Sequence, residues 1–434
     1  MLPVEVPISS ATASVEGSSI SPRFRALQHR NFQLFFGGQL ISLIGTWMQS
    51  TAQLWLVYKL TGSAALLGIF GFANQIPILL LASVGGYIGD RYDRQRGVIW
   101  TQTASMVLAF LLAALTLTGA IEDARGAWIV IIVAFLVGIV NAFDVPIRQA
   151  FLVQMVGRED LPNAIALNSS IFNGARVFGP AIAGTFIAWL EAHHVKSSEG
   201  WCFLLNGFSF LAVIAALLAM RIQKSEAKVA VGSALENFLE GFRFAMSDYA
   251  IRSALLLLSA LSFFGLQYSV FLPLFAKDIL HSGARGFGLL LSAAGVGAVA
   301  GALQFAARTS YKSLAPWIAM TAIVCASGLI VFSQSHLFWL SAAVLFCVGF
   351  AATSQMAATN TIIQNRVPDE LRGRVMAVYA TMFMGIQPVG SLIAGGVAKR
   401  IGAPGTLAMF GAIVLAASLV FAYRLRLRQA TSAA

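Results

Sequence analysis

Charged residues are scarce in this chain of 434 residues. Only 11% of them are charged and 58% are apolar, whereas about a quarter of the residues in an average soluble domain are charged. This composition excludes a water-soluble globular enzyme and a disordered protein. Many runs without Lys, Arg, Asp or Glu reach the roughly 20 residues that cross a bilayer as a helix. The runs are continuously apolar, which excludes a transmembrane barrel of alternating strands.

Cysteine is also rare. The three cysteines, Cys202, Cys325 and Cys347, fall inside apolar runs and show neither CxxC nor Cys/His spacing. This pattern argues against a disulfide framework and against a metal site. The sequence also has no Walker motif and no Ser/His/Asp grouping. We therefore expect neither an ATP-driven pump nor an enzyme, and no cofactor.

The apolar runs predict twelve membrane helices. They lie near residues 31–58, 64–89, 97–120, 127–150, 162–190, 200–220, 251–276, 286–307, 314–333, 337–362, 371–398 and 404–423. The uncharged stretch between Lys312 and Arg366 is too long for one helix, so we divide it at the polar residues 333–336. The sequence thus predicts an all-α membrane protein with twelve spans.

The distribution of basic residues predicts the orientation. The formal net charge of +11 would suggest a nucleic-acid partner in a soluble protein, but beside membrane spans it reports topology, and we expect no nucleic-acid partner. An even number of spans puts both termini on one side, where we count 21 Lys and Arg against seven on the other. This bias places both termini in the cytoplasm of a multi-pass protein of the plasma (inner) membrane.

The spans divide into two parallel six-helix repeats. A disordered tail over 1–21 precedes an N-terminal bundle over 22–220, and a cytoplasmic loop over 221–249 leads to a C-terminal bundle over 250–424 and a tail over 425–434. Within the loop, 235–246 has helical apolar spacing and is expected on the membrane surface. At an offset of 211 residues, helix five matches helix eleven in its glycines. Secondary transporters use such repeats, with the substrate path between them.

The loop after the second helix carries a dense motif. Its pattern, G-x-x-x-D-R-x-G-R-x-R, has Asp93 at the second glycine position, and its other defined positions are Gly86, Asp90, Arg91, Arg94 and Arg96. Topology alone explains the arginines but not the aspartate at the membrane edge. Asp90 can cap the dipole of a facing helix, and Arg91 or Arg94 can pair with a carboxylate on the fourth helix. We expect a cytoplasmic latch that closes in one state and opens in the other.

The fourth helix ends with a candidate ion pair. Asp144 precedes Arg148 by four residues, which is the favourable order for a pair on one helix face. An ion pair at the cytoplasmic rim and a proton-binding site are both consistent with this spacing. In either case Asp144 can exchange partners with the Arg91/Arg94 cluster.

The fifth helix combines an arginine with small residues. Arg176 lies near the middle of the span, where a charge costs roughly 2.5 to 3.5 kcal/mol on insertion, so we expect it to face a substrate cavity. Uncharged polar residues expected beside it are Asn173, Gln49, Gln53, Gln267 and Gln387, although such amides also join helices to one another. Close helix packing is expected at Ala175, Gly179, Pro180, Ala183 and Gly184.

The loop motif resembles the cytoplasmic signature of the major facilitator superfamily, and the segments around Asp144 and Arg176 resemble its efflux branch that contains the enterobactin exporter. The helix-five segment is also similar to an antiporter motif, with alanine at two glycine positions. The resemblance implies a chain embedded in the lipid bilayer. It would export small amphipathic or siderophore-like molecules from the cell by alternating access, in exchange for protons. We expect a monomer.

Other functions remain consistent with these residues. A lysophospholipid transporter group is similar in pattern, so a flippase is an alternative, as is an uptake carrier. A non-transporting scaffold or receptor has no reason to keep a mid-span arginine. Of the carboxylates, only Asp144 is a plausible proton site, with Asp90 and Asp278 nearer the two surfaces.

Overall fold

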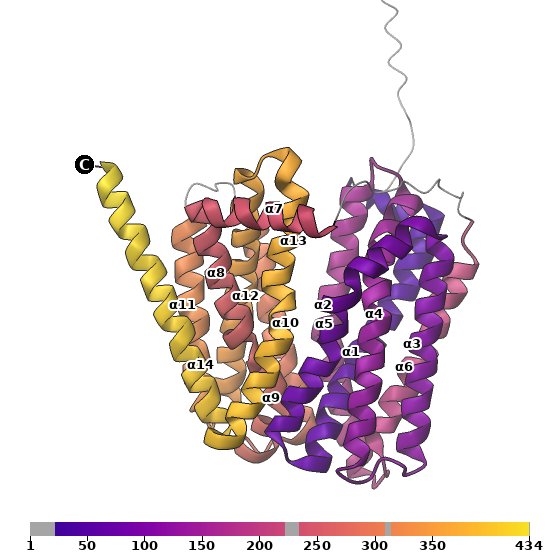
Figure 1. Cartoon of the computed structure of the whole chain (residues 1–434). Coiled ribbons are helices and arrows are strands. Elements are labelled where there is room, and N and C mark those ends of the chain that lie inside the picture. Colours follow the sequence, from indigo (N-terminus) through magenta and orange to yellow (C-terminus); the bar gives the residue numbers. More distant parts are fainter. Residues whose placement is uncertain (1–21, 222–233, 309–313, 434) are drawn as a thin grey trace, which may run out of the picture.

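The computed structural model describes residues 22–221, 234–308 and 314–433. Within these ranges the chain is helical and contains no strand. The predicted tail over 1–21 and most of the predicted loop before residue 234 lie outside the described residues. Both described ends lie at the same face of the molecule, the top in Figure 1. We call it the terminal face and the opposite one the distal face.

The first six spans form the N-terminal half. After a short 3-10 helix over Pro22–Gln28, they are α1 (Arg30–Thr61), α2 (Ala64–Arg91), α3 (Arg94–Leu117), α4 (Gly126–Val156), α5 (Leu161–Ala192) and α6 (Ser198–Leu218). The turns follow local chemistry. Gly62 ends α1 with a positive φ of 58°, and the Ser63 side chain caps α2 by accepting the amide of Leu66. Asp93 caps α3 in the same way.

The second half contains interrupted spans. The helix α7 (Ala234–Ser247) lies across the terminal face of this half (Figure 1), as its apolar spacing predicted. The seventh span joins α8 (Tyr249–Phe264), η2 (Gly265–Gln267), α9 (Tyr268–Leu274) and the π-turn η3 (Phe275–Ile279). The next three are α10 (Gly283–Ala306), α11 (Leu314–Ser333) and α12 (Phe338–Arg366), and the chain ends with α13 (Asp369–Ala380), the π-turn η4 (Thr381–Gly385) and α14 (Gln387–Ala433).

The all-α membrane fold is confirmed. In the described residues, ten helical stretches are long and apolar enough to span a membrane. One of them, Asp369–Arg428, crosses twice, because Gly402 breaks α14 with a φ of 75° and the chain turns back toward the terminal face. The 32-residue α1 also crosses but is too polar to be among the ten. The division at 333–336 is confirmed by the end of α11 at Ser333 and the start of α12 at Phe338.

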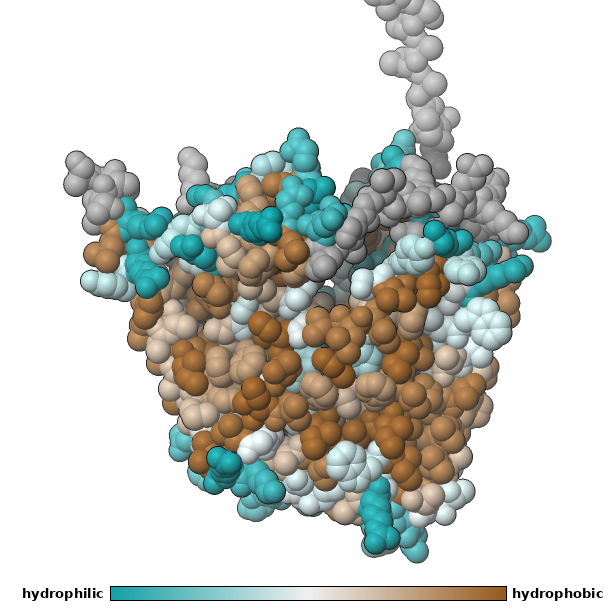
Figure 2. All heavy atoms as spheres, in the orientation of Figure 1, coloured by the Kyte–Doolittle hydropathy of each residue, from teal (hydrophilic) through white to brown (hydrophobic). Residues whose placement is uncertain are grey.

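The surface agrees with a bilayer around the spans. Figure 2 shows an apolar band over the middle of the molecule and hydrophilic residues at its terminal and distal ends. Large apolar side chains such as Trp100, Trp339 and Leu80 are more than 60% exposed. Such exposure suits contact with lipid. The predicted tail over 425–434 is helical to Ala433, as the last part of α14.

Two glycine crossings join the halves. A Cβ on Gly184 of α5 would lie 3.0 Å from the Cα of Gly288 on α10, and one on Gly68 of α2 would lie 2.7 Å from the Cα of Gly395 on α14. Each crossing has a serine that donates across it: Ser292 to Val177 O, and Ser391 to Gly68 O. Span five therefore meets span eight as span eleven meets span two, which is the symmetry expected of a repeat.

The halves are joined at the distal end. One buried apolar cluster there contains residues of both halves, including Trp55, Ile187, Phe287 and Phe410. Toward the terminal face the clusters separate: one belongs to the first half, around Phe151, and others belong to the second, around Leu255 and Ile318. The distal end is therefore closed by a shared core, which the terminal end lacks among the described residues.

Candidate functional site

Arg176 lies midway along α5, where the first half meets the second. Its guanidinium is half-buried and within electrostatic range of Tyr268, a buried residue of α9. On the backbone side, a Cβ on Gly295 of α10 would lie 3.3 Å from the Arg176 carbonyl oxygen. Among the described residues, no carboxylate lies within ion-pair distance of this arginine. Because the Arg176 guanidinium lies at mid-span and has no carboxylate partner among the described residues, it is available to an anionic ligand.

Asp144 of α4 is buried in a network of hydrogen bonds. Its carboxylate is 3% exposed. One oxygen accepts from Thr101 Oγ1 at 2.7 Å and from Gln102 Nε2 at 2.9 Å, both on α3, and the other lies 3.0 Å from Arg148 Nε. The ion pair that the spacing predicted is present. Sequence reasoning missed the two donors on α3, because nothing in the sequence shows which helix faces Asp144.

The second half has uncharged residues at the positions equivalent to Asp144 and Arg148. Asp144 and Arg148 correspond, at the 211-residue offset, to Gln355 and Thr359 of α12. Both of these residues are fully buried and have side-chain atoms without a hydrogen-bond partner. The second half therefore builds the equivalent helix without charge. A buried ion pair is not required for this packing, and it is weak evidence for stability.

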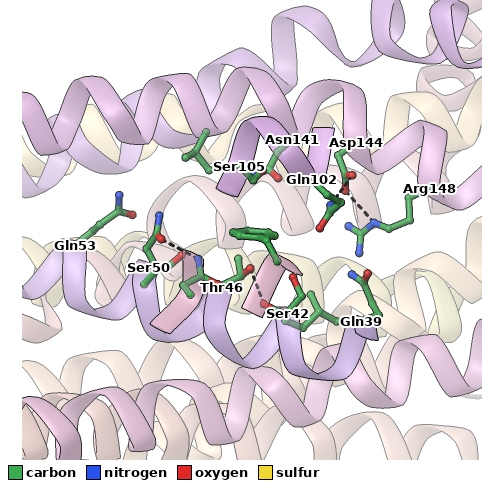
Figure 3. Close-up of a pocket in the computed structure, with 15 residues that line it drawn as sticks. Gln39, Ser42, Thr46, Ser50, Gln53, Gln102, Ser105, Asn141, Asp144 and Arg148 are labelled. Atoms are coloured by element: carbon green, nitrogen blue, oxygen red, sulfur yellow. Dashed lines mark hydrogen bonds and ion pairs between the residues drawn. The ribbon is translucent and has the colours of Figure 1, made fainter. Parts of the chain in front are cut away.

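A polar pocket lies beside Asp144, inside the first half. It has a volume of about 60 Å³ and lies between α1, α3, α4 and α6. Figure 3 shows polar side chains converging on it from these helices. Its polar lining comprises Gln39, Ser42, Thr46, Gln49, Ser50, Gln53, Gln102, Ser105, Asn141, Asp144, Arg148 and Asn206. Arg176 is not among the lining residues.

The glutamines predicted to surround Arg176 do not gather there. Gln49 and Gln53 line the pocket inside the first half, and Gln49 accepts a hydrogen bond from Asn206 of α6 at 2.8 Å. Gln267 donates to the carbonyl oxygens of Ser262, Phe263 and Gln387 and so joins spans seven and eleven. Asn173 of α5 donates to Ser169 O of its own helix. Gln49 and Gln267 therefore join helices, which was the alternative that the sequence left open, whereas Asn173 bonds within α5.

The loop motif reaches α4 through its arginine and glycines. Arg94 Nη1 donates to Ala150 O of α4 at 3.1 Å. A Cβ on Gly85 would lie 2.3 Å from Ala142 O, whereas Gly86 has open space around it. The close approach of α2 to α4 thus depends on Gly85, one residue before the Gly86 of the motif.

The remaining latch residues make local contacts. The Arg91 guanidinium lies over the Tyr87 ring at 4.5 Å, and Arg96 Nε is 4.0 Å from Asp93. The side chain of Asp90 lies outside what the structure describes. Asp144 pairs with Arg148 in this conformation, so the predicted exchange with Arg91 or Arg94 is not part of it.

The small residues of α5 serve two neighbours. A Cβ on Gly179 would lie 2.5 Å from the Trp47 side chain of α1, and Ala175 is fully buried. Further along the helix, the Pro180 carbonyl and Gly184 contact Gly288 of α10, and Ala183 is fully buried. The helix therefore packs against both halves of the molecule.

A polar contact joins the halves at the distal end. The Tyr58 hydroxyl of α1 donates to the Asp278 carboxylate, and Lys277 Nζ lies 5.6 Å from the centre of the Tyr58 ring. Asp278 lies in the π-turn that ends span seven. Beside it, Lys59 pairs with Glu191 at 2.8 Å and with Glu199 at 2.9 Å. Sequence reasoning missed this contact, because Tyr58 and Asp278 are 220 residues apart.

Known proteins match this chain over nearly its full length. A staphyloferrin A transporter of Staphylococcus aureus is 25% identical over 390 residues, which are 89% of this chain and 94% of that protein. The multidrug efflux pump Tap of Mycolicibacterium fortuitum is 25% identical over 86% of this chain and 91% of its own length. A bacterial homologue of the human lysosomal transporter Spinster has the same fold, with a TM-score of 0.69, 13% identity and coverage of 93% of this chain and 97% of that one.

A family model settles the assignment. The model described as transmembrane secretion effector matches residues 20–434. The relatives are transporters rather than enzymes. The chain is a multi-pass membrane transporter of the major facilitator superfamily and belongs to its transmembrane secretion effector family.

Proposed function

We propose that this transporter exports small amphipathic molecules that carry an anionic group, such as siderophores, in exchange for protons. The relatives named for staphyloferrin A transport and multidrug efflux support export. The excess of basic residues on the terminal face supports a cytoplasmic location for that face. The halves then alternate between this distal-closed state and a distal-open one.

The observation that carries the substrate class is Arg176. The residue sits at mid-span where the halves meet, half-buried, and has no carboxylate partner among the described residues. The free-energy cost of placing this charge at mid-membrane is offset when a substrate anion binds beside it. The exposed aromatic side chain of Phe172, one turn from Arg176 on the same face of α5, suits the apolar part of such a molecule.

Proton exchange is supported by Asp144. It is a buried carboxylate whose counterpart in the second half is uncharged, so its charge serves something other than packing. A carboxylate that alternates between an ion pair with Arg148 and a neutral acid can carry one proton per cycle. Each proton that crosses contributes about 2.3 kcal/mol per 100 mV.

The test of the substrate class is transport into proteoliposomes with an imposed proton gradient. The probes are staphyloferrin A, a lipophilic cation and lysophosphatidylglycerol. Arg176→Ala removes charge-assisted hydrogen bonds worth about 1.5 to 3 kcal/mol. The apparent affinity for an anionic probe, measured by its uptake, therefore falls about 10- to 150-fold. Arg176→Lys keeps the positive charge and therefore retains part of the apparent affinity for the anionic probe. Equal losses for the anionic and cationic probes would refute the anion site, and transport of the lysolipid alone would favour a flippase.

The test of proton coupling uses the same vesicles. In Asp144→Asn the carboxylate is lost and the amide keeps its shape, so gradient-driven accumulation stops while exchange of labelled for unlabelled probe continues. Gln355→Leu, at the equivalent position of α12, is the matched control and keeps the response to the gradient. Accumulation that ignores the gradient in the wild type would exclude proton antiport.

A further inference from the structure

Three glutamines that line the polar pocket have buried amide atoms without a hydrogen-bond partner. These atoms are Oε1 of Gln39, Nε2 of Gln53 and Oε1 of Gln102. Each of these side chains is at least nine-tenths buried. An unsatisfied buried polar group costs about 1 to 3 kcal/mol. Three such groups around one cavity indicate an occupant that both donates and accepts hydrogen bonds.

The size and charge of the pocket restrict this occupant. A volume of about 60 Å³ holds several water molecules but no drug-sized ligand. An apolar molecule would leave the amides unsatisfied. A metal cation would meet the Arg148 guanidinium, which already neutralises Asp144. Water satisfies both the donor and the acceptors.

The polar side chains form a continuous line along α1. Gln39, Ser42, Thr46, Gln49 and Gln53 follow one another at spacings of three and four residues, so they share one face of the helix. At 1.5 Å per residue this line is about 21 Å long. It faces α3, α4 and α6 of the same half.

We infer that this pocket holds a chain of water molecules that delivers protons to Asp144 through the interior of the first half, separately from the substrate path between the halves. The inference rests on the proton exchange proposed above. A proton passes from a water molecule to an Asp144 oxygen, the carboxylate becomes a neutral acid, and the positive charge of Arg148 is released from its ion pair.

Gln39 is the positioning residue for the released arginine. In Figure 3 the amide of Gln39 and the guanidinium of Arg148 point toward one another across the pocket, and Gln39 Oε1 has no partner. When Asp144 is neutral, this oxygen accepts from Arg148. The other groups that face Asp144 are Thr101 and Gln102 of α3, which carry no charge and donate hydrogen bonds to the carboxylate.

Infrared spectroscopy of the purified full chain tests this without a substrate. A pH titration reports the C=O stretch of a protonated carboxylic acid, and the part of this band that is missing in Asp144→Asn belongs to Asp144. On mixing with D₂O, the Asp144 band of the wild type shifts rapidly, because the pocket water exchanges. Ser105→Leu fills the pocket and abolishes the rapid shift. Thr103→Leu places the same leucine side chain on α3 outside the pocket lining and leaves the rapid shift unchanged.

The role of Gln39 is tested by the midpoint of the same titration. Gln39→Leu leaves Arg148 without its second acceptor, so protonation of Asp144 becomes harder and the midpoint moves to lower pH. Gln355→Leu, which removes an equally buried amide of the second half, does not move it. A purely structural role for Gln39 would change stability but not the midpoint.

The outcomes separate the two proposals. If no band disappears in Asp144→Asn at any pH, Asp144 takes up no proton and the proposed exchange fails at this residue. If the band is present but Ser105→Leu exchanges as fast as the wild type and Gln39→Leu keeps its midpoint, proton exchange stands and the water chain is refuted.

Discussion

Replacing Gly184 by alanine should weaken the distal closure selectively. A Cβ at this position of α5 would lie 2.4 Å from Ala284 O and 3.0 Å from the Gly288 Cα of α10. Both atoms are backbone, so the methyl group cannot be accommodated by rotating a side chain. The helices have to move apart, and the Ser292 hydrogen bond to Val177 O, 2.6 Å long, lies on the same crossing.

The magnitude follows from the cost of overpacking. Inserting a methyl group into a close-packed contact costs about 1 to 3 kcal/mol. In alternating access, the distal ends of α5 and α10 separate in the other state, so this cost falls on the distal-closed state alone. The ratio of distal-open to distal-closed molecules then rises about 5- to 150-fold.

Distances between two spin labels across the terminal face, measured by double electron–electron resonance, report this ratio. One label at Glu159 and one at Arg372, both exposed, report the separation of the halves, after the exposed Cys347 is replaced by serine. Gly184→Ala should add a population with a shorter distance. Gly174→Ala is the matched control on the same helix, because its Cβ would have no atom within 4 Å. An unchanged distribution in Gly184→Ala, or an equal shift in both variants, would refute the reasoning.

Two further perturbations test contacts of the fold. Tyr58→Phe removes the hydrogen bond to the Asp278 carboxylate. A bond to a charged group is worth about 1.5 to 3 kcal/mol, so the variant should raise the distal-open population about 10- to 150-fold in the same distance measurement; no shift would show that this contact does not hold the distal end. Gly241→Leu places a side chain against the Arg374 backbone, where even a Cβ would lie 2.6 Å away. It should detach α7 from α13 and lower the melting temperature in detergent, whereas Gly373→Leu, in open space, should not.

Much of the fold could be predicted because membrane helices leave a local signature. Charge-free runs gave the positions of the spans, and the polar residues at 333–336 marked a turn inside a stretch of 53 uncharged residues between Lys312 and Arg366. The interruptions of spans seven and eleven could not be predicted. Their 3-10 and π-turns occur within apolar sequence, where hydropathy is the same for every helical geometry.

The candidate site was predicted less completely, because it depends on which helices are neighbours. The Asp144–Arg148 pair lies on one helix and follows from spacing alone. Periodicity also places Gln49 and Gln53 on one face of α1, but it does not show whether that face meets the second half or the interior of the first. The contact of Gln49 with Asn206, 157 residues away, decides this.

The polarity of α1 has a consequence for biogenesis. Its stripe of glutamines and hydroxyl side chains keeps it out of the set of helices that are apolar enough to span a membrane on that criterion. The amide of Gln49 finds its partner only when Asn206 of α6 has been synthesised and inserted. The first helix of the nascent chain therefore enters the bilayer with unsatisfied polar groups, and its residence there depends on three later helices, α3, α4 and α6. We therefore predict that truncated chains that end before α6 retain α1 poorly in the membrane, whereas chains that include α6 retain it.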